Sequence, residues 1–261
     1  MPPAPSMDYE FESNGLTLRG HLAQPPDTDG ARPGLVLCHG FPVRGREAAA
    51  SGKSFPELAD RIATEMGWQV LTLNFRGCGQ SEGNFSMAGW RDDIHGRVEH
   101  LHGLGIADVW LAGTGTGGAL CLIEGAQNQS IVGVAVLASP ADFQDWAKDP
   151  RGLLKHARTV GVVKDASFPA NFDTWAAELK ELNPEKAAAA FADRSLLVLH
   201  GDSDDLVPST DARAIAHSHG NAELRVITGG GHELRHDPRA VAILLGWLTR
   251  DQDTRVRQDS H

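Results

Sequence analysis

Residues 109–122 read VWLAGTGTGGALCL, and this stretch decides the fold. The apolar residues up to Ala112 predict a short buried strand. The next six residues, GTGTGG, are all glycine or threonine, and the apolar ALCL that follows predicts the first turn of a packed helix. A strand that turns sharply into a helix between small residues holds its central residue, here Gly115, at a positive φ.

Strand and helix patterns alternate along the rest of the chain. Strands are predicted at 9–12 and 16–22 (a hairpin around Asn14-Gly15), and at 34–38, 68–73, 109–112, 131–138, 195–199 and 223–227. Helices are predicted at 54–66, 87–104, from 119 onward, at 210–217 and at 238–248. This alternation is typical of an α/β protein with a mainly parallel sheet and helices on both faces.

The domain organisation follows from where the alternation of strand and helix patterns begins, is interrupted and ends. We predict a single domain over residues 8–250, preceded by a flexible N-terminus at 1–7 and followed by a polar, frayed tail at 251–261. Short helical patterns outside the sheet predict a cap insert at about 140–193.

Composition excludes several classes of function. Lys and Arg number 24 against 34 Asp and Glu, a formal net charge of −10, so we expect no nucleic-acid partner. The apolar runs are too short to span a membrane, the N-terminus lacks a signal-peptide pattern, and the three cysteines have no paired spacing. These features predict a cytoplasmic protein. The spacing of His95, His100 and His102 differs from that of a metal pair, so no metal or other cofactor is predicted.

Four further motifs each follow a predicted strand, and the carboxyl ends of parallel strands are where α/β sheets bind ligands. We therefore expect these loops to converge on one rim. They are His39-Gly40-Phe41-Pro42, Arg76-Gly77-x-Gly79-x-Ser81-x-Gly83, His200-Gly201-x-x-Asp204-x-x-Val207-Pro208 and Gly231-His232-x-Leu234.

Taken together and in this order, the motifs resemble those of the α/β-hydrolase superfamily over residues 8–248. The resemblance is nearest to small-capped members, such as the serine aminopeptidase, lysophospholipase-like and dienelactone hydrolases. It implies that Asp204 is the acid and His232 the base of a catalytic triad. It also implies that the backbone N–H groups of Phe41 and Thr116 stabilise an oxyanion.

The chain departs from the family pattern at residue 115, where G-x-S-x-G requires a nucleophile and this sequence has glycine. Covalent catalysis needs an oxygen or sulfur beside the base. In a comparable triad, loss of the nucleophile costs about 10⁶ in kcat, and roughly 10³ to 10⁴ of acceleration remains. Thr114 and Thr116 flank the position, but a slip in register and a positive φ at a β-branched residue would be required. Cys78 and Cys121 are interpreted as packing residues.

Two functions remain open at this point. In the first, His232, oriented by Asp204, acts as a general base on water or on a substrate proton, and the substrate is a small ester, thioester or carbonyl compound. In the second, the pair is a structural relic, and the protein is a pseudoenzyme that binds a small ligand or a protein partner in the former pocket. An engineered replacement of serine by glycine is a third interpretation. The sequence gives no basis for predicting the oligomeric state.

Two polar residues near the predicted rim are interpreted as structural. His39 and Arg76 are expected to support their own loops by hydrogen bonding. The aromatic residues of the insert either line an apolar pocket or pack the insert on the body, and packing is favoured for each of them: Phe143, Trp146 and Trp175.

Overall fold

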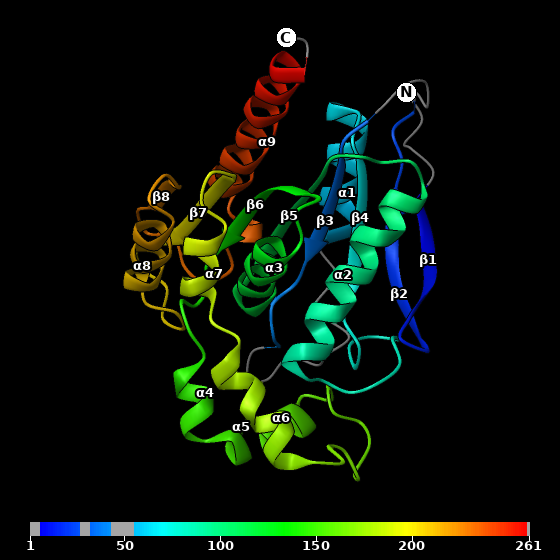
Figure 1. Ribbon diagram of the computed structural model, residues 1–261, viewed down its shortest axis with the longest axis vertical. Helices are drawn as coiled ribbons and strands as arrows, with labels where there is room; N and C mark the ends of the chain where they lie inside the picture. The colour runs from blue at the N-terminus through cyan, green and yellow to red at the C-terminus, as the bar shows by residue number, and fades with distance from the viewer. Residues whose placement is uncertain (1–5, 27–31, 43–54, 260–261) are drawn as a thin grey trace.

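The computed structural model describes residues 6–26, 32–42 and 55–259, and within these ranges the strands form one eight-stranded sheet (Figure 1). The strands are β1 (Ser6–Ser13), β2 (Leu16–Ala23), β3 (Gly34–Cys38), β4 (Gln69–Asn74), β5 (Val109–Thr114), β6 (Ile131–Leu137), β7 (Ser195–Gly201) and β8 (Glu223–Ile227). Their order in the sheet is β1-β2-β4-β3-β5-β6-β7-β8. The first two strands pair antiparallel, and β3 to β8 run parallel, which confirms the predicted mainly parallel sheet.

Helices lie on both faces of this sheet (Figure 1). They are α1 (Phe55–Met66), α2 (Met87–Gly103), α3 (Gly115–Gln127), α4 (Gln144–Lys148), α5 (Pro150–Thr159), α6 (Phe172–Glu181), α7 (Pro184–Ala190), α8 (Ser209–His219) and α9 (Pro238–Asp259). The apolar side chains of α1 and α9 pack on one face. Those of α2, α3, α7 and α8 pack on the other.

The alternation along each strand explains why two cores form. In β3, Leu35 and Leu37 belong to the core under α1 and α9, whereas Val36 and Cys38 belong to the core under α2 and α3. Successive side chains of a strand point to opposite faces, so a strand that is apolar at every position is buried on both sides. The apolar runs in the sequence therefore position the parallel strands in the middle of the molecule.

The hairpin between β1 and β2 turns at Asn14-Gly15, as predicted. Asn14 has φ 50° and Gly15 has φ 76°. Two consecutive positive φ values are what a two-residue type I′ turn requires, and the Asn-Gly pair accommodates them at low cost.

The junction of β5 and α3 is packed too closely for side chains at two of its glycines. A Cβ on Gly117 would lie 2.1 Å from the carbonyl oxygen of His39, and one on Gly113 would lie 2.6 Å from the backbone nitrogen of Gly118. Because backbone atoms stand in the way, both residues must be glycine for strand and helix to approach this closely. The turn between them is therefore fixed by main-chain packing.

The predicted cap insert at about 140–193 contains helices α4 to α7, and two chain ends differ from the prediction. Helices α4, α5 and α6 project beyond one end of the sheet, whereas α7 packs against α3 and α8 (Figure 1). Strand β1 begins at Ser6, within the predicted flexible segment. Helix α9 continues to Asp259 instead of ending near Leu248, so the tail is helical over most of its length. Its residue Asp251 accepts a hydrogen bond from the Trp110 indole at 2.7 Å, which ties the helix to β5.

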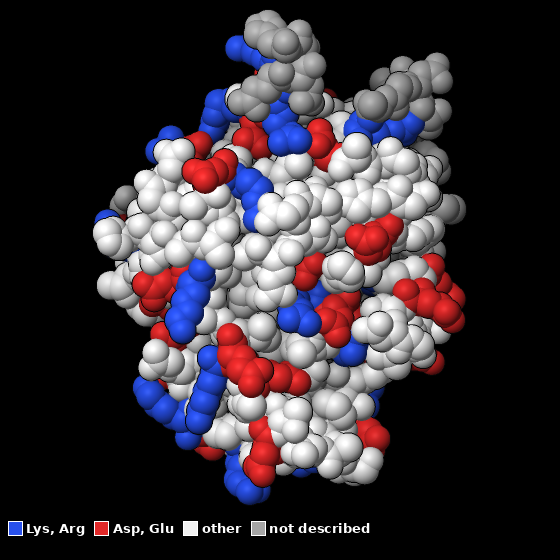
Figure 2. All heavy atoms as spheres, in the orientation of Figure 1, with Lys and Arg blue, Asp and Glu red and all other residues white. Residues whose placement is uncertain are grey.

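The described surface carries mixed charge. On the face drawn in Figure 2, Lys and Arg side chains are interspersed with Asp and Glu. No helix among the described residues has both the length and the apolar character needed to cross a bilayer.

Candidate active site

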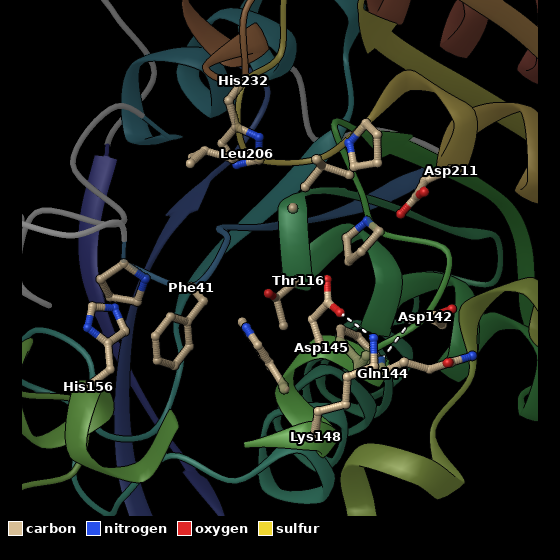
Figure 3. A pocket seen from close by; sticks show the side chains of 17 residues that line it. Phe41, Thr116, Asp142, Gln144, Asp145, Lys148, His156, Leu206, Asp211 and His232 are labelled. Carbon is tan, nitrogen blue, oxygen red and sulfur yellow. Dashed lines mark hydrogen bonds and ion pairs between the residues drawn. The ribbon is translucent and has the colours of Figure 1, made fainter. Parts of the chain in front are cut away.

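A cavity of about 640 Å³ lies at the carboxyl ends of the parallel strands, next to α4 and α5 of the cap (Figure 3). Its lining comes from the loops that follow β3, β5, β6, β7 and β8 and from these two cap helices. Four of the residues singled out in the sequence line it: Phe41, Gly115, Thr116 and His232. The fifth, Asp204, is not a lining residue and contacts Nδ1 of His232. Three of the four motif loops thus meet at one rim with the bend at residue 115, as predicted, whereas the loop at 76–83 contributes no residue to the described lining.

Residue 115 stands at the sharp bend between β5 and α3. Gly115 has φ 52°, in the left-handed region that L-residues with a side chain adopt only with strain. A Cβ built on it would point at the imidazole of His232, at 3.6 Å from Nε2 and 3.8 Å from Cε1. The next nearest atom is the Cα of Gly40, at 3.8 Å. Unlike its neighbours Gly113 and Gly117, Gly115 therefore has room for a Cβ, which would be in ordinary van der Waals contact with His232 and Gly40.

The imidazole of His232 is oriented by a carboxylate. His232 Nδ1–H donates to Asp204 Oδ2 at 2.9 Å, and the side chain of Asp204 is fully buried, whereas that of His232 is 19% exposed. The other oxygen, Oδ1, accepts the backbone N–H groups of Leu206 and Val207, each at 2.9 Å. This arrangement fixes the tautomer of His232, so that its Nε2 carries a lone pair directed at residue 115.

A second histidine, which the sequence analysis placed in a motif but gave no role, also approaches the carboxylate. His200 is completely buried, and its Nε2–H donates to the carbonyl oxygen of Val207 at 2.9 Å and lies 3.4 Å from Asp204 Oδ2. Burial acts to raise the pKa of Asp204, but hydrogen bonds from both imidazoles and two backbone N–H groups outweigh it and hold that pKa well below its usual range. Asp204 is consequently a stable anion throughout the neutral and mildly acidic pH range.

Two residues whose backbone N–H groups are candidate oxyanion donors, Phe41 and Thr116, line the same cavity. Thr116 is in the first turn of α3, where N–H groups have no partner within the helix. Phe41 follows Gly40, whose Cα is in contact range of the Cβ position at residue 115. Both residues line the cavity, and the positive end of the α3 dipole favours negative charge there. The arrangement can therefore stabilise an oxyanion formed next to residue 115.

His39 and Arg76 hold their loops, as predicted. His39 is 1% exposed; its Nδ1–H donates to the carbonyl oxygen of Gly40 at 2.8 Å, and its Nε2 accepts the backbone N–H of Phe75 at 3.3 Å. Burial lowers the pKa of His39 to about 4, so the ring is neutral at pH 7. The guanidinium of Arg76 donates twice to Asp93 Oδ1, at 2.8 and 3.0 Å, and does not line the cavity within the described residues.

The cavity has an aromatic side and an acidic side. In Figure 3, Phe41 and His156 lie on one side, and their ring centroids are 5.8 Å apart. The carboxylates on the opposite side come from the loop after β6, from α4 and from the first turn of α8: Asp142, Asp145 and Asp211. Burial and the nearby carboxylates raise the pKa of Asp211.

The cap aromatics divide between the two roles considered for them. Phe143 and Trp146 serve both: they line the cavity, and Phe143 is also 4% exposed and packs in the core with Trp146 against it. Trp175 does pack: it is 4% exposed, and its indole N–H donates to the carbonyl oxygen of Phe85 at 3.1 Å.

Other residues considered as nucleophiles lie elsewhere. Cys78 and Cys121 are fully buried, and burial raises the pKa of both thiols. Thr114 lines a separate small cavity on the other side of the sheet edge, next to Leu37 and Phe55. Thr116 lines the main cavity, but the bend with positive φ is at Gly115. Within the described residues, no group of three or more His, Cys, Asp or Glu side chains has the arrangement to hold a metal ion.

Comparison with known proteins agrees with this geometry. A model of the alpha/beta hydrolase fold family matches residues 33–160, a range that contains the junction of β5 and α3. The chain is 25% identical over 156 residues to a proline iminopeptidase of Lactobacillus delbrueckii subsp. bulgaricus. That match covers 56% of this chain and 50% of the relative, so it spans about half the length of the curated protein.

Solved structures match over nearly the whole chain. The alpha/beta hydrolase GrgF from Penicillium sp. sh18 superimposes with a TM-score of 0.73 at 19% identity, covering 95% of this chain and 99% of that one. Est1E from Butyrivibrio proteoclasticus gives a TM-score of 0.68 at 18% identity, covering 97% and 99%. At these identities the likeness concerns the fold alone.

Proposed function

We propose that this chain, which has the α/β-hydrolase fold, belongs to that superfamily and hydrolyses a small ester, thioester or carbonyl compound with His232 as the general base. Within the superfamily we assign it to the small-capped enzymes of the serine aminopeptidase and lysophospholipase-like type. The short cap of α4, α5 and α6 and the similarity to a proline iminopeptidase support this assignment.

In the proposed reaction, water takes the place of a serine hydroxyl. A water molecule in the space over Gly115 attacks the substrate carbonyl carbon while His232 Nε2 removes one of its protons. The carbonyl electron pair moves to the oxygen, which accepts the N–H groups of Phe41 and Thr116. When the intermediate collapses, the bond to the leaving group breaks, and the proton on Nε2 passes to that group. Asp204 keeps its negative charge and stabilises the imidazolium that forms in between.

One observation carries the proposal: the 3.6 Å between His232 Nε2 and the Cβ position of residue 115. Because no side chain occupies this position, one water has room between Nε2 and a carbonyl carbon. No covalent acyl-enzyme forms at residue 115 in this mechanism, because glycine has no side chain to acylate. Rate enhancement is accordingly limited to roughly the 10³ to 10⁴ that a triad without its nucleophile retains.

A second function is favoured by the same glycine. A pocket of about 640 Å³ that has lost its nucleophile but kept its shape is suited to binding a small ligand or a protein segment without turnover. In that case Asp204 and His232 only hold two loops together. The protein is then a pseudoenzyme.

The cellular context belongs to the proposal as well. We place the protein in the cytoplasm, since its cysteines Cys38, Cys78 and Cys121 are all free and buried. The net charge of −10 supports a small-molecule partner rather than a nucleic acid.

Hydrolysis of p-nitrophenyl acetate and butyrate tests the two functions against each other. We expect native protein to release p-nitrophenol above the buffer rate, and His232→Gln to lose at least about tenfold of that excess. His236→Gln is the matched control, because His236 is an exposed histidine four residues away whose nearest acidic partner, Glu233, is 3.9 Å distant. Equal rates for native protein and His232→Gln would exclude the general base and leave ligand binding as the function.

A further inference from the structure

We infer that the space over Gly115 binds a second, compact substrate, and that the protein transfers acyl groups to it in preference to water. The inference rests on the proposed function, because the same imidazole must remove a proton from the attacking group. The inference goes beyond the proposed function by assigning an acceptor site and the chemical class of the acceptor. The acceptor is a neutral hydroxyl or amino compound of about two non-hydrogen atoms.

The size of the acceptor follows from what surrounds residue 115. The atoms nearest to its Cβ position are His232 Nε2 at 3.6 Å, and His232 Cε1 and the Gly40 Cα at 3.8 Å each. These are ordinary van der Waals distances, so a first atom fits at the Cβ position without displacing its neighbours. A second atom fits beyond it, where a serine hydroxyl would meet the imidazole. A single water fills only one of the two positions, whereas a two-atom nucleophile fills both.

The walls of this space do not yield to larger molecules. His232 is held by its hydrogen bond to the fully buried Asp204. Gly40 is restrained in turn, since a Cβ on it would lie 3.0 Å from the carbonyl oxygen of Thr114. The acceptor site is therefore bounded by two restrained groups, the imidazole of His232 and the backbone of Gly40.

The charge around the space selects a neutral, protic acceptor. Nε2 of His232 is a proton acceptor, because Nδ1–H is engaged with Asp204. A protonated amine has no lone pair with which to attack, and an anion would compete with the oxyanion for the N–H groups of Thr116 and Phe41. A hydroxyl or neutral amino group satisfies both conditions, since it donates a hydrogen to Nε2 and offers a lone pair to the carbonyl carbon.

The transfer step balances without a co-reactant. The acceptor X–H attacks the acyl carbon of an ester, a C–X bond forms, and the X–H proton moves to His232 Nε2. The carbonyl electron pair goes to the oxyanion and returns as the C–O bond to the leaving alcohol breaks, and the proton on Nε2 passes to that alcohol. The products are the acylated acceptor and the free alcohol. The cavity of about 640 Å³ above the acceptor site leaves room for the acyl donor.

Two hydroxylamines of different size test the inference on native protein. With p-nitrophenyl butyrate as donor, hydroxylamine has two non-hydrogen atoms, and O-benzylhydroxylamine offers the same nitrogen nucleophile on a group too large for the space. Hydroxamate is measured by mass spectrometry alongside p-nitrophenol release. We expect hydroxamate formation to saturate with hydroxylamine, and the preference for hydroxylamine over O-benzylhydroxylamine to exceed the uncatalysed preference at least tenfold.

A variant locates the acceptor. Gly115→Ala places a methyl group in the first of the two positions, with no neighbouring atom closer than 3.6 Å, and should lower enzymatic hydroxamate formation at least tenfold. His236→Gln should leave it unchanged. Circular dichroism establishes that the alanine variant is folded, and the comparison of the two hydroxylamines on native protein needs no variant at all.

The outcomes separate this inference from the proposed function. If hydrolysis depends on His232 but hydroxamate forms with the same preference between the two hydroxylamines as in the uncatalysed reaction, acyl transfer is overturned. Hydrolysis then remains the proposed activity. Saturable hydroxamate formation without hydrolysis above the buffer rate supports acyl transfer and overturns hydrolysis as the activity. Full hydroxamate formation by folded Gly115→Ala means that the acceptor binds elsewhere, and absence of both products overturns both proposals.

Discussion

Replacing Gly115 by serine should turn the cavity into a serine-hydrolase site. The Cβ of the new side chain lies 3.6 Å from His232 Nε2. With a C–O bond of about 1.4 Å and a tetrahedral angle at oxygen, the hydroxyl oxygen comes to roughly 2.9 Å from that nitrogen, within the 2.6–3.2 Å of a nucleophile–base pair. The proposed base, its carboxylate and the two proposed oxyanion donors already lie at the cavity, so only the nucleophile is added.

The gain can be bounded from comparable triads, in which the nucleophile is worth about 10⁶ in kcat. We expect Gly115→Ser to raise kcat on p-nitrophenyl butyrate at least about 10²-fold, which is roughly 2.7 kcal/mol of activation free energy. The substitution also has a cost. A residue with a side chain at φ 52° loses about 1–2 kcal/mol of unfolding free energy, which lowers Tm by roughly 2–8 °C.

Labelling supplies the decisive readout for this variant. A serine-directed fluorophosphonate should modify Gly115→Ser at position 115, as seen by peptide mass spectrometry, and should leave native protein unmodified. The double variant with His232→Gln should lose both the label and the gain in kcat. A folded Gly115→Ser protein that neither reacts with the phosphonate nor gains activity would refute the argument from distance, and with it the assignment of residue 115 as the nucleophile position.

Three further predictions concern the residues around this position. Asp204→Asn should lower the excess rate of ester hydrolysis at least about tenfold, because the amide no longer fixes the tautomer of His232; unchanged steady-state kinetics would contradict this role. For His39, whose pKa is about 4 in the folded protein and about 6.5 unfolded, stability is full above pH 6.5 and is lost as the pH falls from 6.5 to 4, by about 3 kcal/mol. Urea unfolding at several pH values should show a smaller loss in His39→Gln, and parallel curves would contradict the buried neutral ring. Gly117→Ala should cost about 3 kcal/mol or more in urea unfolding, because its Cβ would lie 2.1 Å from a backbone oxygen, whereas Gly115→Ala should cost only about 1–2.

The sequence predicts the sheet because its signals are local. Apolar runs, the Asn14-Gly15 turn and the glycine-rich stretch at 113–118 each specify a strand, a hairpin or a bend within a few residues. The order of these motifs along the chain then brings Asp204 and His232 to one rim, since parallel strands all end on the same side. That topology brings the two loops together, and within them the side chains of Asp204 and His232 are 2.9 Å apart.

Features that depend on contacts between distant segments escape the sequence analysis. Nothing in the polar pattern after Leu248 indicates that α9 continues to Asp259; its contacts with β5 through Asp251 involve residues more than a hundred positions away. The contact between His200 and Asp204 is between residues close in sequence, and it too could not be predicted. The four-residue spacing between His200 and Asp204 suggests that the two side chains are close. The direction of the His200 imidazole, however, depends on its hydrogen bond to the carbonyl of Val207, and the sequence does not reveal that bond.

The same limit applies to the walls of the cavity. Phe143 and Trp146 read equally well as packing residues and as lining residues, because an aromatic side chain serves either purpose. The choice is made by how the cap helices sit over the strand ends, which no local pattern encodes. The acidic side of the cavity, formed from α4, α8 and the loop after β6, is likewise a product of tertiary packing.

Gly113, Gly115 and Gly117 alternate along the junction and cannot be told apart from the sequence pattern. The structure shows that glycine is favoured at these positions for different physical reasons. At Gly113 and Gly117, a Cβ would strike backbone atoms within 2.6 Å, so the fold itself requires glycine. At Gly115, the nearest atom is 3.6 Å away and the surroundings would admit a side chain, so only the positive φ favours glycine. Packing therefore does not explain the residue that matters for chemistry. Glycine at the position that faces the oriented imidazole is favoured by backbone conformation alone, which is why substitutions at residue 115 test the proposed chemistry without disturbing the packing of the junction.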